Sequence, residues 1–220
     1  MFVGHLAVSL AAKAIEPKAP LSALVPTTFG LDLIWPIFVL LDVEIVAIVP
    51  GITAFTPLDF LFYPWSHSLI MAVMWGAVAA GFMYGPRRSL RVAFLVGAVV
   101  VSHWFLDFVT HRPDLPLWPE GPKLGLGLWY SIPGTLIVEG GLFLSAIVIY
   151  TRAWKPLDAI GKWAFRGVVG FTGLIWITQP WSTTPPSSSA MATVALAMII
   201  FPWWAAWIDR HRSGVQTVSN

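Results

Sequence analysis

Three ionisable residues spaced four apart, His103, Asp107 and His111, close a long apolar run in the sequence VSHWFLDFVTHRPDLPLWP. On a helix, residues four apart differ by about 6 Å along the axis and by about 40° around it, so His103 and Asp107 share one face. An imidazole nitrogen and a carboxylate oxygen on one face suit a divalent metal ion. We expect these two residues to bind zinc, with manganese or iron as alternatives.

His111 lies farther around the helix than Asp107, about 80° from His103. The helix is expected to end or bend there, because Pro113 and Pro116 follow at once. At this position His111 is either a further metal ligand or a catalytic proton donor at the mouth of the site.

The other candidate ligands are spread over the first third of the chain. No cysteine is present, so any metal must be held by His, Asp or Glu. His5 lies near the N-terminus, Asp32 near the middle of one apolar run and His67 at the start of another. Ionisable groups inside a bilayer are costly, roughly 2.5–3.5 kcal/mol for Asp on insertion scales, and such residues are functional candidates by default. We therefore expect His5, Asp32 and His67 to join His103 and Asp107 in one metal or proton-relay site.

The composition indicates an integral membrane protein. Hydrophobic residues make up 57% of the chain and charged residues 11%, whereas roughly a quarter of a soluble domain is charged. The fold class we expect is all-α, a polytopic transmembrane helical bundle of about six spans preceded by a short N-terminal helix over residues 2–15. The predicted spans are residues 21–41, 65–84, 91–110, 131–151, 164–180 and 189–208.

Loop charges predict the orientation of these spans. Eleven of the 13 Lys and Arg residues fall on alternate loops, which places those loops on the cytoplasmic side of an inner (plasma) membrane. Residues 1–208 then form a single integral membrane domain, and residues 209–220 a cytoplasmic tail. The candidate ligands lie near the outer face. No basic stripe alternates with stacking aromatic residues, so we expect no nucleic acid partner.

Four short motifs occur in order along the first half of the chain. They are a Gly-His pair, an acidic position in an early helix, a Ser-His-Ser triplet and a His-x-x-x-Asp-x-x-Thr pattern. The residues are Gly4 and His5, then Asp32, then Ser66, His67 and Ser68, then His103, Asp107 and Thr110. Together they resemble the YdjM-like family of inner-membrane metal-dependent hydrolases. Where that family has two aspartates in the early helix, this chain has one, and His111 stands where the family usually has Pro or a small residue.

The resemblance implies metal-assisted hydrolysis. The three motif histidines and one or both of Asp32 and Asp107 would hold the ion. A carboxylate that is not a ligand would orient a ligand or act as catalytic general base, a role open to Asp32, Asp107 and Glu139. The hydroxyl groups expected to support the ligands by hydrogen bonds are those of Ser66, Ser68 and Thr110.

A site near the outer interface favours a lipid-like ester or phosphoester as substrate, so the expected partner is a membrane lipid or a lipid-linked small molecule. An aromatic and Pro-rich segment, residues 53–68, leads to His67. It is either an interfacial re-entrant loop or part of an entrance, for which the candidate residues are Asp59, Tyr63 and Asp114.

Two other functions fit the same residues. Buried His and Asp residues on several helices can carry protons or a divalent metal ion through a transporter. They can also hold a non-catalytic metal that stabilises the protein. The lack of an inverted repeat and the gathering of the candidate ligands at one face argue against transport. The sequence leaves open whether the protein is an enzyme and what its oligomeric state is.

Overall fold

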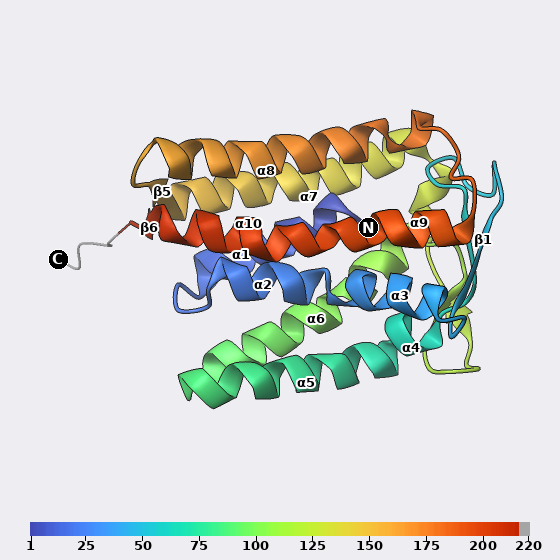
Figure 1. The fold of residues 1–220 in the computed structure, drawn as a ribbon, viewed down its shortest axis with the longest axis horizontal. Helices are drawn as coiled ribbons and strands as arrows, with labels where there is room; N and C mark the ends of the chain where they lie inside the picture. Colours follow the sequence, from blue (N-terminus) through green and yellow to red (C-terminus); the bar gives the residue numbers. More distant parts are fainter. Residues whose placement is uncertain (216–220) are drawn as a thin grey trace.

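The computed structural model describes residues 1–215, and 68% of the chain is helical (Figure 1). The helices are α1 (Val3–Ile15), α2 (Leu21–Thr28), α3 (Gly30–Leu40), α4 (Pro64–His67), α5 (Leu69–Arg87), α6 (Leu90–Thr110), α7 (Ile132–Ala153), α8 (Ala159–Thr178), α9 (Ser188–Ala195) and α10 (Ile200–Arg210). The expected all-α fold class is confirmed. Short antiparallel strand pairs lie at the two ends of the bundle (Figure 1). They are β1 (Ile45–Ile48) with β2 (Leu58–Phe62), β3 (Leu115–Pro116) with β4 (Lys123–Leu124), and β5 (Trp154–Pro156) with β6 (Arg212–Gly214).

Several helices are long and apolar enough to cross a membrane. Within residues 1–215 there are four, and α2 with α3 makes a fifth if this bent pair is one span. The four are Leu69–Pro86, Leu90–Thr110, Ile132–Ala153 and Ser188–Arg210. These helices suggest a membrane protein, but the expected number of about six spans is not confirmed. The predicted span at residues 164–180 corresponds to α8, which is not among the four and carries Lys162 and Arg166 near its start.

The apolar run predicted as one span over residues 21–41 is broken at Phe29. At this residue the chain bends, so that the axis of α3 is turned by 47° from the axis of α2. Phe29 leaves helical geometry, with φ −89° and ψ 5°, and Pro26 has no backbone N–H to continue the hydrogen-bond ladder of α2. The break places Asp32 in the first turn of α3 and brings the carbonyl group of Thr28 to α6.

Two close helix pairs position the candidate ligands. The first helix, α1, packs on α7, and α5 packs on α6 (Figure 1). Gly76 and Gly97 let α5 and α6 approach closely, because a Cβ atom on Gly76 would lie only 2.9 Å from the Gly97 carbonyl oxygen. Small residues at such a crossing hold the two helices in a defined register, which fixes where α6 presents its polar end.

The end of the bundle opposite the C-terminus is covered by two segments, residues 41–63 and 111–131, which we call the cap (Figure 1). The backbone N–H of Phe55 donates to the carbonyl oxygen of Trp129 at 3.1 Å and joins the two segments. Phe60, Tyr63 and Leu115 are buried beneath them. The buried side chains of the cap are part of the same hydrophobic core as the helices, so the cap packs directly on the bundle.

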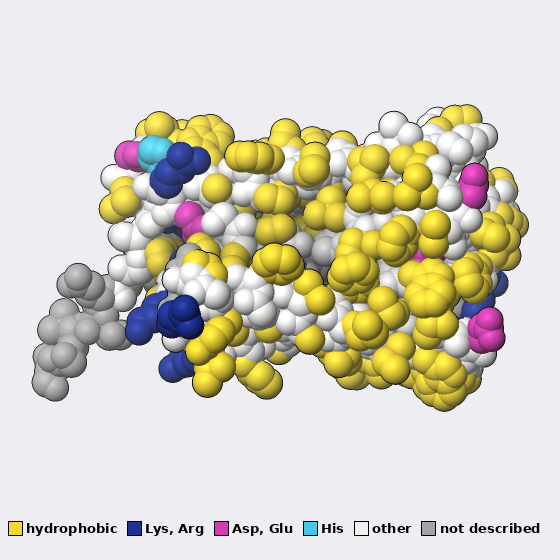
Figure 2. Space-filling view, turned by 60° about the horizontal axis from the view of Figure 1, so that its bottom comes forward, with side chains coloured by type: hydrophobic (Ala, Val, Ile, Leu, Met, Phe, Trp, Pro, Cys, Tyr) yellow, Lys and Arg dark blue, Asp and Glu magenta, His cyan; other side chains and the backbone are white. Residues whose placement is uncertain are grey.

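Charged side chains are concentrated at the other end. Figure 2 shows an apolar surface over the middle of the molecule, with most of the visible Lys and Arg side chains near the C-terminal end. At that end the predicted tail is partly folded. Helix α10 continues to Arg210, and β6 pairs with β5, so the predicted boundary after residue 208 falls within a helix. Arg212 is buried there, 4.7 Å from the ring centre of Phe165. Residues 216–220 of the predicted tail lie outside the described part of the chain.

Candidate metal centre

The five residues expected to bind metal come together beneath the cap. His5 comes from α1, Asp32 from α3, His67 from α4, and His103 and Asp107 from α6. Two overlapping groups have their ligand atoms within 4.8 Å of one another. The groups are His5, His103 and Asp107, and Asp32, His67 and His103. A buried cluster that can hold a metal ion is therefore present in the structure.

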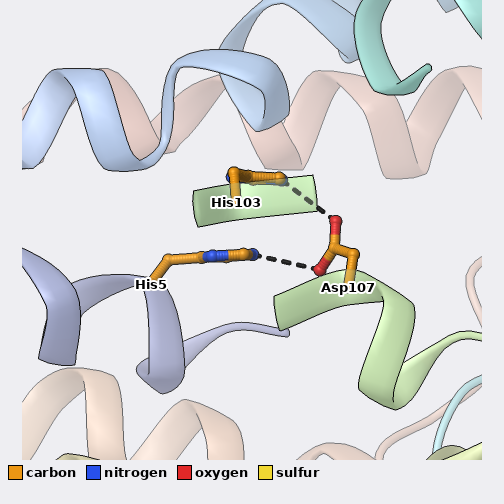
Figure 3. A group of neighbouring side chains, drawn as sticks. All are labelled: His5, His103 and Asp107. Carbon is orange, nitrogen blue, oxygen red and sulfur yellow. Dashed lines mark hydrogen bonds and ion pairs between the residues drawn. The ribbon is translucent and has the colours of Figure 1, made fainter. Parts of the chain in front are cut away.

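Asp107 lies at the edge of the two imidazoles of the first group, with one interaction to each ring (Figure 3). Its Oδ1 is 3.2 Å from His5 Nε2, and its Oδ2 is 3.1 Å from His103 Nε2. The two imidazole rings stack with 3.7 Å between their centres and 6° between their planes. Both rings thus point the same nitrogen, Nε2, at one carboxylate.

Asp32, on α3, faces His5 and His103 and also His67. Its Oδ1 is 3.4 Å from His67 Nε2 and 3.7 Å from His103 Nε2, and its Oδ2 is 3.9 Å from His5 Nε2. Each carboxylate therefore turns one oxygen toward His5 and the other toward the remaining pair of imidazoles. Such a set can hold one ion or share its carboxylates between two.

Hydrogen bonds outside the cluster fix which ring nitrogens carry protons. The Nδ1–H of His103 donates to the carbonyl oxygen of Thr28 at 2.7 Å. His67 Nδ1 lies 2.7 Å from Ser66 Oγ, whose single proton goes to the carboxylate of Glu44 at 2.6 Å. Ser66 must then accept from His67 Nδ1–H. In the neutral imidazoles, the Nε2 lone pairs of both histidines consequently point at the carboxylates.

Lone pairs that face carboxylates repel them unless a cation lies between. Among the described residues, His103 Nε2 and His5 Nδ1 are buried nitrogens without a hydrogen-bond partner. Satisfying His103 Nε2 requires either a proton or a metal ion, and a divalent ion would satisfy the neighbouring imidazoles and carboxylates at the same time. The residues present thus fit a metal. Their nitrogen and oxygen donors are compatible with zinc, manganese or iron and do not choose between them.

Burial leaves one approach to the cluster. His5 and His103 are fully buried, and the exposed fraction is 1% for Asp107 and 3% for His67. The Asp32 side chain, in contrast, is 25% exposed. The accessible part of the site is therefore on the side of the broken helix pair, while the cap covers its end.

Glu139 lies beside the first turn of α1 and holds it in place. Its Oε1 accepts hydrogen bonds from the backbone N–H groups of Phe2 and Gly4, the latter at 3.2 Å, and its Oε2 accepts from Trp176 Nε1 at 2.9 Å. The amino group of Met1 pairs with Asp107. Glu139 was expected as a candidate general base. These hydrogen bonds tie α7 to α8 and to the segment that carries His5, and the role as general base stays a prediction.

His111 occupies an aromatic box next to the cluster. Its Nε2 is 4.0 Å from Asp107 Oδ2, and its Nδ1 is 3.0 Å from Asp114 Oδ1. The centre of its ring is 4.3 Å from that of Trp129 and 4.9 Å from that of Phe60. The carboxylate of Asp114 thus orients one nitrogen of His111, so that the other faces the candidate ligands.

The residues expected at an entrance belong to the support of His111. Tyr63 donates a hydrogen bond to Asp114 Oδ1 at 3.1 Å. Burial, and then the carboxylate of Asp114, raise the pKa of Tyr63 well above its usual range, so this hydroxyl stays protonated and remains a donor. Arg112 joins Asp114 to Asp59, with Nε 3.0 Å from Asp114 Oδ2. Tyr63 and Asp114 are buried, which places them behind the site and away from an open mouth.

Of the three hydroxyl groups expected to support the ligands, only that of Ser66 contacts a ligand side chain. Ser68 Oγ accepts from Met71 N at 3.3 Å and caps α5. Thr110 Oγ1 donates to the backbone oxygen of Asp107 at 3.3 Å. The acidic residue that completes the support of His67, Glu44, was not among the expected site residues. Its only signal in the sequence is a carboxylate in the apolar run DVEIVAIV.

Comparison of the chain with family models, curated proteins and solved structures found no match. The resemblance to the YdjM-like family therefore rests on the four sequence motifs.

Proposed function

We propose that this protein is a membrane-bound, metal-dependent hydrolase that acts on a lipid-like ester or phosphoester near the outer face of the membrane. The observation that supports this best is the pair of histidines held from outside the cluster. His67 and His103 each have Nδ1 engaged, so that Nε2 is free to bind a metal between Asp32 and Asp107. His67 and His103 also belong to the four sequence motifs on which the resemblance to the YdjM-like hydrolases rests.

The residues have separable roles in this proposal. The three histidines and the two aspartates would hold the ion, and the chemistry that a bound divalent ion would supply there is a water molecule of lowered pKa and a polarised ester or phosphoester oxygen. His111 stands beside this set, oriented by Asp114, and transfers a proton to the leaving group or from the water. Asp32 is the most exposed of the five, and substrate would enter on its side.

The shape of the protein around the site favours a substrate that comes from the membrane. Phe60 and Tyr63 of the cap are buried over one end of the site. The partly exposed side chain of Asp32 lies next to the break between α2 and α3. That break lies in an apolar helix pair, and we propose that the path to Asp32 runs along these helices. A lipid or lipid-linked compound with a polar head fits this path.

Metal content and hydrolysis measured on the same sample test the proposal. We expect protein purified in detergent without chelator to carry stoichiometric zinc, manganese or iron, detected by elemental analysis. It should hydrolyse phospholipid or fluorogenic ester substrates, lose this activity with chelator and regain it when the ion is returned. Protein without metal would rule out the proposal. Metal-dependent uptake into liposomes without hydrolysis would favour a transporter, and tightly bound metal with neither activity a stabilising site.

The orientation of the chain in the membrane can be tested separately. Because 11 of the 13 basic residues fall on one set of loops, we propose an inner-membrane location with the C-terminus in the cytoplasm. A reporter fused after Asn220 should be active only in the cytoplasm, and one inserted in the loop at Glu120 only outside it. The opposite pattern would place the metal centre at the cytoplasmic face.

A further inference from the structure

Glu44 is a buried carboxylate with three hydrogen-bond donors. It lies between α3 and β1 and is 2% exposed. Its Oε1 accepts the backbone N–H groups of Trp65 and Ser66, both at 2.8 Å, and its Oε2 accepts Ser66 Oγ at 2.6 Å. The residues that supply these donors belong to the first turn of α4, the helix that carries His67. A carboxylate from the cap thus holds the element that presents one of the candidate ligands.

Two hydrogen bonds link His67 to Glu44 through Ser66, and in both the donor is on the His67 side and the acceptor on the Glu44 side. A carboxylate only accepts, so Ser66 must give its proton to Glu44 and accept one from His67 Nδ1, 2.7 Å away. His67 Nε2 then keeps its lone pair, directed at Asp32 Oδ1 at 3.4 Å. If the direction were reversed, the proton of His67 would move to Nε2 and block metal binding.

We propose that Glu44 is a positioning residue that, through Ser66, sets the tautomer and orientation of His67 for metal binding. This inference rests on the proposed metal site. Partners of this kind typically change metal affinity about 10- to 100-fold. Because the two backbone donors anchor Oε1, Glu44 has a defined orientation, and a substitution of the same shape can reverse the hydrogen bonds that it makes.

The variant Glu44→Gln should reverse two hydrogen bonds, the one between residue 44 and Ser66 Oγ and the one between Ser66 Oγ and His67 Nδ1, while keeping the shape. The amide oxygen must face the N–H groups of Trp65 and Ser66, so its NH₂ group faces Ser66 Oγ and donates to it. Ser66 would then donate to His67 Nδ1. We expect zinc affinity of the full-length protein in detergent, measured by competition with a chromophoric chelator, to fall by about 100-fold in Glu44→Gln and about 10-fold in Ser66→Ala.

The double variant distinguishes this mechanism from a loss of packing. Without the Ser66 hydroxyl, the amide introduced by Glu44→Gln has no route to His67, so the Glu44→Gln, Ser66→Ala double variant should bind zinc as Ser66→Ala does. Additive losses, or wild-type affinity in Glu44→Gln, would overturn the proposal. Glu120→Gln, a substitution in the cap away from His67, is the matched control and should bind zinc like the wild type.

A measurement on metal-free protein separates this inference from the proposed function. The nitrogen-15 chemical shifts of His67, assigned by their loss in His67→Gln, should show a proton on Nδ1 in the wild type and on Nε2 in Glu44→Gln. The same tautomer in both proteins would overturn the role of Glu44. A tautomer that changes between the two proteins, in a chain whose wild type binds no metal, would contradict the hydrolase proposal and leave the positioning role supported.

Discussion

We expect replacement of His103 with alanine to abolish metal binding at the proposed site and, with it, the proposed hydrolysis, while the helices stay folded. His103 belongs to both groups of residues that can hold an ion, and its Nε2 lies 3.1 Å from Asp107 Oδ2 and 3.7 Å from Asp32 Oδ1. Since losing even an outer partner of a metal ligand costs about 10- to 100-fold in affinity, we expect losing this central ligand to cost more than about 100-fold. Elemental analysis after gel filtration, together with circular dichroism, measures the two effects.

A second substitution guards against a simple packing defect at this position. His103→Gln keeps most of the side-chain volume and should lose metal as the alanine variant does. His211→Ala is the matched control, because His211 lies in the C-terminal region, 2.7 Å from Asp158, and should keep full metal content. Stoichiometric metal in both His103 variants would show that the cluster is not the binding site.

The candidate ligands could be predicted from the sequence because ionisable groups are rare and costly in apolar helices. Each of His5, Asp32, His67, His103 and Asp107 interrupts or borders an apolar run, and the structure brings all five together. Serine and threonine gave a weaker signal. Their hydroxyls readily bond to the local backbone, as those of Ser68 and Thr110 do, so closeness in sequence to a ligand does not predict contact with it.

Contacts between distant segments could not be predicted in the same way. Glu44 reaches Ser66 across 22 positions through the folding of the cap, and the acceptor for His103 is a backbone carbonyl, which sequence does not distinguish. The break at Phe29 falls in a run whose hydropathy predicts one span; Pro26 and Gly30 on either side permit a break but do not fix its angle. The all-α fold class was therefore easier to predict than the point at which a helix breaks or the number of membrane spans.

Replacing His111 with glutamine will leave the metal bound and slow hydrolysis by about 10²- to 10⁴-fold, the usual contribution of general acid or base catalysis. The reason is its position. His111 Nδ1 is held by Asp114 at 3.0 Å, and its Nε2 is 4.0 Å from Asp107 Oδ2, next to the ligands. Hydrolysis rates and metal content, measured on the same preparation, check both parts of the prediction.

The variants around His111 decide between its two expected roles. Asp114→Asn keeps a side chain of the same shape but weakens the hold on His111 Nδ1, so it should slow hydrolysis less than His111→Gln does and also retain metal. Tyr63→Phe removes the hydroxyl that donates to Asp114 and lies 3.3 Å from His111 Nδ1; because Asp114 still holds His111, this variant should have the smallest effect of the three. If His111→Gln instead loses metal as His103→Ala does, His111 is a ligand. If it retains both metal and rate, the aromatic box around His111 is structural, and the proton must be transferred by one of the aspartates.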